Sequence, residues 1–153
     1  MSAPAYDEGN IFARILRGEL PAHRVYEDDS SLVVMDIMPT ADGHCLVIPK
    51  AACRNVLDAD PSVLQKLMPV VQKIARAVLE AFEADGVAIY QFNESASGQS
   101  VFHLHFHVVP RHQGVPQRPH GSKMEDQAVL SANAERIRKV LERSGREAVP
   151  PQS

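Results

Sequence analysis

The chain has 153 residues, of which 44% are hydrophobic and 23% charged, a composition typical of one globular domain rather than of a disordered, collagen-like or coiled-coil chain. No apolar run approaches the roughly 18 residues that a membrane helix needs, and residues 1–10 lack the pattern of a secretory signal. The formal charge is −3 without a block of like charge, so we expect neither a nucleic-acid nor a membrane partner. Two cysteines, Cys45 and Cys53, make no disulfide framework and favour a reduced, cytoplasmic location.

The predicted elements form one domain over 1–153, with loose ends at about 1–8 and 145–153. In chain order they are a short helix over 11–16, strands over 24–26, 31–36 and 45–48, a long helix over 61–83, strands over 87–92 and 101–109, and a last helix over 131–143. Asp60 and Pro61 mark the start of the long helix, Pro69 should kink it or cost it a hydrogen bond, and Gly145 should stop the last helix. Hairpin-joined strands, a helix and two more strands predict an α+β fold with a five-stranded, mainly antiparallel sheet, one long helix and two shorter ones.

Three histidines at 103, 105 and 107 alternate with Leu104 and Phe106. Residues two apart on a strand project from one face, so the pattern predicts a row of three imidazoles with apolar side chains behind it. Chance histidines on a polar face are a weak explanation, because each buried imidazole needs hydrogen-bond partners.

Two functional interpretations of this row remain. Neutral imidazoles are common zinc ligands, so the histidines could bind a metal ion. Alternatively, one imidazole attacks phosphorus while the others donate protons or stabilise charge. The preceding segment 93–100 is small, polar and rich in hydrogen-bonding groups. Such a loop suits an anionic group better than a metal, which favours the second interpretation.

The segment 103–109, HLHFHVV, resembles the His-x-His-x-His-x-x signature of the histidine-triad (HIT) family, in which x is apolar. Other blocks are similar in order and spacing: 11–22 (IFARILRGELPA), 25–29 (VYEDD), 36–39 (DIMP), 43–50 (GHCLVIPK), Asn93 and 98–100 (GQS). The resemblance covers 10–111 and implies a HIT-like fold, a homodimer, and a hydrolase or transferase of purine nucleotide derivatives that resembles the bacterial Hint-type branch.

The same resemblance implies the catalytic roles. His105 matches the nucleophile that forms a covalent nucleotidyl-histidine, which water then cleaves. His107 and His44 match residues beside the phosphate that stabilise charge and pass protons, and His103 matches the residue that supports the strand.

The resemblance also implies substrate contacts. Gln99 and Ser100 match residues that hydrogen-bond the phosphate or the leaving group, and Asn93 matches one that holds the phosphate side of the site. Asp36 matches the ribose-binding carboxylate, although it could simply cap a turn. Phe12, Ile15 and Ile37 match the apolar slot for the purine ring, although they could be plain core.

The chain departs from the family pattern at two places. Relatives with a structural zinc have ligands where this chain has Asn10, Ala13 and Ala52, so we expect no structural zinc and no cofactor. Asp42 precedes Gly43 and His44, and its charge could weaken the binding of polyphosphates.

The leading expectation is therefore a metal-independent nucleoside phosphoramidase. Three alternatives stay open: a dinucleoside polyphosphate hydrolase, a nucleotide-binding regulatory module with little turnover, and a metal-dependent hydrolase.

Overall fold

The computed structural model describes residues 4–119, 121 and 123–148. Its centre is a five-stranded sheet with the order β1-β2-β3-β5-β4, in which every neighbouring pair is antiparallel. The strands are β1 (Arg24–Glu27), β2 (Ser31–Met35), β3 (Cys45–Pro49), β4 (Gly86–Tyr90) and β5 (Phe106–Arg111). The predicted antiparallel α+β architecture is confirmed.

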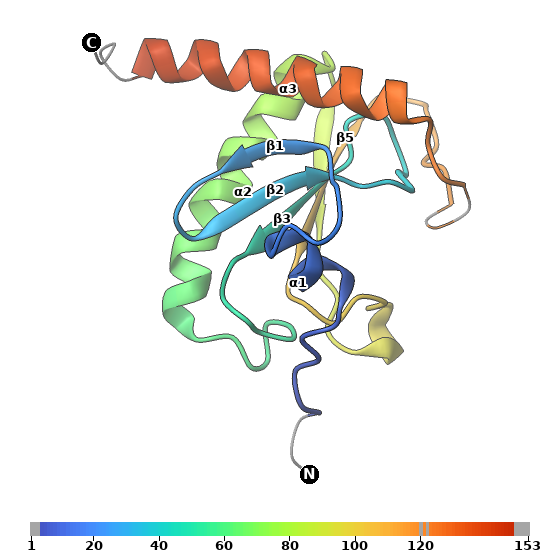
Figure 1. Cartoon of the computed structure of the whole chain (residues 1–153). Helices are drawn as coiled ribbons and strands as arrows, with labels where there is room; N and C mark the ends of the chain where they lie inside the picture. The colour runs from blue at the N-terminus through green and yellow to red at the C-terminus, as the bar shows by residue number, and fades with distance from the viewer. Residues whose placement is uncertain (1–3, 120, 122, 149–153) are drawn as a thin grey trace.

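The two faces of the sheet bury different apolar clusters. On one face, α2 (Pro61–Ala81) packs against β3, β4 and β5, and α3 (Gln127–Ala148) packs against α2, β1 and β2 (Figure 1). The strand residues of this cluster include Val33, Val47 and Val108. On the other face, Phe12 and Ile15 of α1 (Ile11–Leu16) pack with Leu32, Val34, Leu46 and Ile48. Because side chains alternate along a strand, the side chains of β2 and β3 that point away from α2 and α3 lie on the same face of the sheet as α1.

The helices begin at residues that cap them. The Asn10 side chain accepts a hydrogen bond from the Ala13 N–H, and the Asp60 side chain accepts one from the Ser62 N–H. Pro69 lies inside α2, which continues through it to Ala81. Because proline has no backbone N–H, it costs the helix one hydrogen bond, as expected. Within the described residues, no helix is both long and apolar enough to cross a membrane.

The last helix is longer than predicted at both ends. The Asp126 side chain accepts a hydrogen bond from the Ala128 N–H, so α3 begins at Gln127 and not at Ser131. Gly145 does not stop it, and α3 reaches Ala148. The part of the chain that the structure describes therefore has two long α-helices and one short one, not one long and two shorter ones. Residues 149–153 of the expected loose end lie outside the described residues.

The fifth strand is shorter than predicted at its start. β5 begins at Phe106, so residues 101–105 precede the sheet ladder. The amide N–H of Leu104 instead donates to the Cys53 carbonyl. His107 thus lies on the strand, while His103 and His105 lie on the irregular segment that leads into it.

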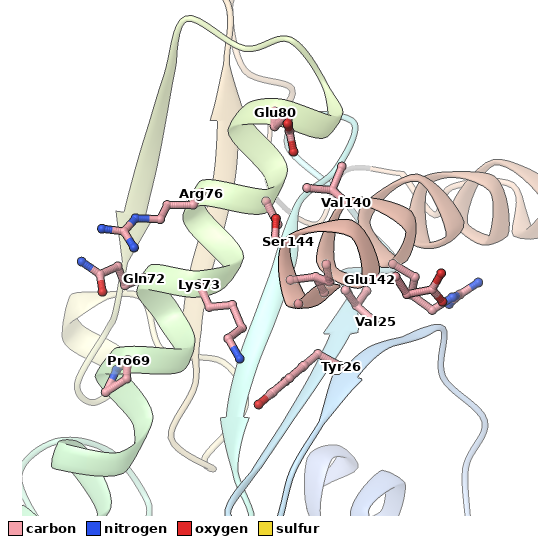
Figure 2. Close-up of a pocket in the computed structure, with 14 residues that line it drawn as sticks. Val25, Tyr26, Pro69, Gln72, Lys73, Arg76, Glu80, Val140, Glu142 and Ser144 are labelled. Carbon is pink, nitrogen blue, oxygen red and sulfur yellow. The ribbon is translucent and has the colours of Figure 1, made fainter. Parts of the chain in front are cut away.

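A hollow of about 800 Å³ lies between α2, α3 and β1 (Figure 2). Val25 and Tyr26 of β1 line it together with both helices, and the Lys73 ammonium lies 4.8 Å from the centre of the Tyr26 ring. Among the described residues, no histidine lines this hollow. It lies on the face of the sheet that α2 and α3 cover.

Candidate active site

His105 is held by its own chain. Its ring Nδ1 lies 2.7 Å from the carbonyl oxygen of His103. A carbonyl only accepts, so Nδ1 must carry a proton and donate it. In a neutral imidazole the other nitrogen, Nε2, then has a lone pair. His105 is buried, and the ring of Phe12 meets it edge-on with the centroids 4.8 Å apart. The packing and the hydrogen bond therefore orient a nucleophilic nitrogen.

His103 is fixed in the opposite tautomer. Its Nε2 lies 2.8 Å from the Pro49 carbonyl and so donates, whereas its Nδ1 lies 2.5 Å from the hydroxyl of Tyr6 and accepts. Only 1% of the residue is exposed, and this burial lowers the pKa of the imidazole. His103 is thus a neutral ring whose two nitrogens are both occupied. Sequence reasoning missed Tyr6 because nothing in the pattern links residues 97 positions apart.

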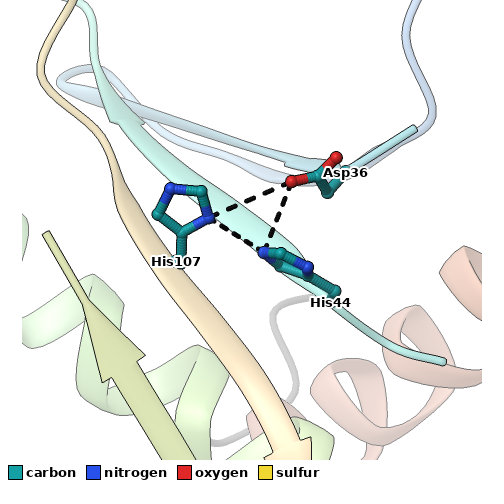
Figure 3. Close-up of side chains that lie close together, drawn as sticks. All are labelled: Asp36, His44 and His107. Atoms are coloured by element: carbon teal, nitrogen blue, oxygen red, sulfur yellow. Dashed lines mark hydrogen bonds and ion pairs between the residues drawn. The ribbon is translucent and has the colours of Figure 1, made fainter. Parts of the chain in front are cut away.

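His44 and His107 form a buried pair beside Asp36 (Figure 3). The Thr40 amide N–H donates to His44 Nδ1 over 3.1 Å, so the proton of a neutral His44 sits on Nε2. That Nε2 lies 2.9 Å from His107 Nδ1 and 3.4 Å from a carboxylate oxygen of Asp36. His107 Nδ1 therefore accepts, and its own proton lies on Nε2. The ring centroids of His105 and His107 are 4.9 Å apart.

Asp36 contacts a backbone N–H and the histidine pair at once. One carboxylate oxygen accepts a hydrogen bond from the Met38 N–H over 2.8 Å, which fixes the turn after β2. The other lies near His44 and, at 3.9 Å, near His107 Nδ1. The turn-capping alternative is thus seen in the structure, together with a contact to the histidine pair that the sequence did not predict.

The polar loop before the histidines is held by a buried amide. Gln99 Nε2 donates to the carbonyls of Arg54 and Val101, and its Oε1 accepts from the Glu94 N–H and from Asn55. All the hydrogen-bonding capacity that an amide oxygen and two N–H groups offer is used in this way. Gln99 therefore ties the loop together, and its side chain is occupied by these partners.

Neighbouring residues complete this network. Asn93 Oδ1 accepts from the Val56 N–H over 2.9 Å, whereas Ser100 is exposed. Glu94 has a positive φ of 73°, a conformation that costs energy in a residue with a Cβ. Its carboxylate receives two hydrogen bonds of 2.8 Å from the Arg54 guanidinium, which hold it there and lower its pKa.

The residues of the expected base slot have different surroundings. Phe12 contacts the rings of His103 and His105, whereas Ile15 is buried in the cluster beneath α1. Ile37 is 44% exposed. Phe12 is thus brought to the histidines, Ile15 serves the core, and Ile37 offers an open apolar surface beside Asp36.

The segment after β5 returns to the His44 loop. The Arg118 guanidinium forms ion pairs with Asp42, at 2.6 Å, and with Glu125, at 3.0 Å. The Arg118 N–H also donates to the Thr40 carbonyl. The acidic Asp42 that distinguishes this chain is therefore neutralised by a partner, and the segment braces the loop that holds His44.

Comparisons with known proteins agree with this geometry. Residues 17–114 match the model of the HIT domain. The chain belongs to the HIT family. A HIT-like protein of Bartonella henselae has the same fold, with a TM-score of 0.84 and 51% identity over 89% of this chain and 99% of that one. The predicted family and fold are confirmed.

Curated relatives of this HIT protein show similar overlap. The Protein hit of Bacillus subtilis is 40% identical over 105 residues, which are 69% of this chain and 72% of the relative. The adenosine 5'-monophosphoramidase of Saccharomyces cerevisiae is 36% identical over 112 residues, which are 72% and 68% of the two chains.

Asp36, His44 and His107 have ligand atoms within 4.8 Å of one another, a spacing compatible with a small divalent ion. The tautomer argues against it. A histidine that ligates through Nε2 normally donates its Nδ1 proton to an acceptor, but His44 Nδ1 receives the Thr40 N–H. His44 Nε2 then carries a proton and has no lone pair for a metal.

Proposed function

We propose that this HIT protein is a hydrolase that releases a nucleoside monophosphate from purine nucleoside phosphoramidates through a nucleotidyl-histidine on His105. The observation that supports it most directly is the 2.7 Å hydrogen bond from His105 Nδ1 to the His103 carbonyl. That bond leaves Nε2 with the lone pair that a nitrogen nucleophile requires.

In the first proposed step, the lone pair of His105 Nε2 forms a bond to the α-phosphorus. The P–N bond to the leaving group breaks, its electron pair stays on the leaving nitrogen, and that nitrogen takes up a proton through water. The Nε2–H of His107 hydrogen-bonds a phosphate oxygen as charge develops there. His44 keeps that proton on the correct nitrogen of His107, because its own N–H occupies the Nδ1 of His107.

In the second step, water attacks the phosphorus and the bond from Nε2 to phosphorus breaks. The electron pair returns to Nε2, the extra proton of the water passes to solvent, and the nucleoside monophosphate leaves. Two displacements of moderate difficulty thereby replace one that is hard.

The remaining contacts in this proposal follow the resemblance to the HIT family. Ser100 is exposed at the end of the polar loop and hydrogen-bonds the phosphate, while Gln99 and Asn93 act from the network that shapes the loop. Asp36 accepts hydrogen bonds from the ribose hydroxyls while holding the histidine pair. Phe12 and Ile37 form the apolar slot for the purine ring, with Ile15 supporting Phe12.

The phosphoramidase activity is favoured by the relative from S. cerevisiae, whose name describes that activity. A dinucleoside polyphosphate hydrolase with the same nucleophile is the alternative, and a binding module with little turnover is the third candidate.

The same proposal includes a homodimer, a cytoplasmic location and no metal or cofactor. β4 is an edge strand with Ile89 46% exposed, a surface suited to a second copy.

The test compares turnover of an adenosine phosphoramidate with that of a diadenosine polyphosphate by the same purified protein. We expect kcat/KM at least tenfold higher for the phosphoramidate. A preference for the polyphosphate supports the alternative activity, and binding of both without turnover supports the module. Light scattering of the same sample gives the mass of the assembly.

A further inference from the structure

We infer that Tyr6 is a positioning residue for the nucleophile: its hydroxyl fixes the ring of His103, and the backbone carbonyl of His103 fixes His105. The inference rests on the proposed role of His105. It gives the segment before α1 a place in catalysis, although that segment precedes every block of the sequence that resembles the HIT family.

The hydroxyl contact is specific in direction. His103 Nε2 donates to the Pro49 carbonyl over 2.8 Å, so Nδ1 needs a donor. The Tyr6 hydroxyl, 2.5 Å away, supplies it. Because only 1% of His103 is exposed, a buried acceptor is left without its partner if this hydroxyl is removed.

The ring of His103 also anchors the backbone beside it. Residues 101–105 lie outside the sheet ladder, since the pairing of β3 with β5 involves only Val108, His107 and Phe106 on the β5 side. The Leu104 N–H to the Cys53 carbonyl is one attachment of this stretch. Gln99 Nε2 donates to the Val101 carbonyl at its start. The two ring hydrogen bonds of His103 are further attachments, and they act on the residue whose carbonyl receives the proton of His105 Nδ1.

Tyr6 is itself placed by a local network. The Gly9 N–H donates to the Asp7 side chain over 2.8 Å, and the Asn10 N–H donates to the Asp7 carbonyl. The Arg17 guanidinium donates to the Glu8 carbonyl over 2.8 Å. These contacts hold the segment over the histidines, where the Tyr6 ring meets that of His103 edge-on with the centroids 5.7 Å apart.

The consequence concerns the tautomer of His105. If the His103 carbonyl is held in place, His105 keeps its proton on Nδ1 and its lone pair on Nε2. If His103 loosens, the proton of His105 distributes over both nitrogens, and only part of the enzyme has the reactive lone pair. Small misplacements of this kind lower catalytic rates strongly.

The test is Tyr6→Phe, which removes the hydroxyl and keeps the ring. We expect kcat to fall roughly tenfold with KM within about twofold of wild type, because the substrate contacts remain. Two-bond ¹H–¹⁵N NMR of the imidazoles, on unliganded protein, should show wild-type His105 as the Nδ1–H tautomer and the variant as a mixture. Both spectra are recorded well below the unfolding midpoint of each protein.

The matched control is Tyr26→Phe. The Tyr26 hydroxyl donates to Asp28 over 2.9 Å, and the ring packs against the cluster on the opposite face of the sheet. This variant should keep both kcat and the His105 tautomer.

The outcomes separate the two proposals. A wild-type kcat and an unchanged His105 tautomer in Tyr6→Phe overturn the inference, as does a loss of kcat with the tautomer unchanged. If the wild-type protein turns over no nucleotide, the proposed function fails, while the spectra still decide whether Tyr6 positions His105.

Discussion

The ring of Phe82, at the end of α2, closes directly against Gly43, the residue before His44. A Cβ on Gly43 would lie 2.5 Å from a carbon of that ring, and Gly43 has a φ of +91°. Both facts exclude a side chain, since a positive φ strains residues with a Cβ and the space is filled by an aromatic ring. The end of the long helix therefore determines where the His44 loop can lie.

Gly43→Ala should consequently damage both stability and catalysis. We expect a loss of about 2–4 kcal/mol in the free energy of unfolding, from combined overpacking and backbone strain, and a lower kcat because His44 is displaced. Urea denaturation and steady-state kinetics measure the two effects. The control is Gly86→Ala, because a Cβ there meets nothing within 4 Å. Equal stability losses in both variants would contradict the role of Phe82.

The nucleophile assignment predicts a large difference between two neighbouring histidines. His105→Ala should lower kcat by roughly 10⁴-fold or more, because the covalent route is lost altogether. His103→Ala should lower it less, because His103 acts only through the position of His105. Nucleotide binding by His105→Ala should stay within a few-fold of wild type.

The covalent intermediate gives an independent check of this assignment. Rapid-quench mass spectrometry, without acid, should find one nucleoside monophosphate on the peptide that contains His105. If no adduct is found and His105→Ala keeps most of its activity, direct attack by water is the better mechanism.

The local pattern predicted a row of imidazoles, but their supports depend on distant contacts. Alternation over 103–107 was enough to expect three imidazoles on one face; the rings of His105 and His107 do lie close together, with centroids 4.9 Å apart, whereas the ring of His103 is bonded to Tyr6 and Pro49. The same alternation extended the strand too far, because the N–H of Leu104 bonds Cys53 and not a neighbouring strand. The Tyr6 contact spans 97 positions, and no sequence periodicity encodes such a pair.

The boundaries of α3 show a second limit. Gly145 was expected to end the helix because glycine readily adopts a positive φ. The glycines that do so are Gly18, Gly43, Gly98, Gly114 and Gly121, and Gly145 is not among them. Composition alone cannot distinguish a glycine that terminates a helix from one that continues it.

Gln99 gives a test of the polar loop. In Gln99→Glu, a carboxylate replaces the amide that donates to the carbonyls of Arg54 and Val101, so acceptors face acceptors in a buried site. We expect the free energy of unfolding to fall by about 2–4 kcal/mol, measured by urea denaturation. Ser100→Ala, at an exposed position, should change it by less than about 0.5 kcal/mol. Equal effects would mean that Gln99 is not structural.

The buried His103 predicts how stability depends on pH. Burial holds the pKa of His103 in the folded protein below its usual value, which is about 6.5 in an unfolded chain. The nearby His105 lowers it further, while the Pro49 carbonyl and Asp58 raise it less than burial lowers it. The unfolded chain therefore binds a proton there first as the pH falls, and it gains stability relative to the folded protein.

The contribution of His103 is fully present above about pH 6.5 and is lost as the pH falls toward the folded-state pKa. Urea midpoints measured from pH 8 to pH 5 should thus decrease more steeply in wild type than in His103→Gln, whose amide can still donate to Pro49. Parallel curves for the two proteins would show that His103 does not titrate differently in the two states.

The tautomer of His44 predicts that catalysis needs no metal. The Thr40 N–H donates to His44 Nδ1, so the proton of His44 lies on Nε2. For Nε2 to ligate an ion, this proton would have to move to Nδ1, and the hydrogen bond from Thr40 would break. Activity should be unchanged after dialysis against a strong chelator, and purified protein should contain much less than one zinc per chain. Cobalt(II) offers a direct probe, because a tetrahedral site with imidazole ligands gives an intense visible absorption. We expect no such absorption when cobalt(II) is added to the purified protein. Asp36→Asn removes the carboxylate nearest the pair and is the control for any weak binding. Stoichiometric zinc, together with loss of activity on chelation and its recovery on adding zinc, would establish a metal-dependent hydrolase instead.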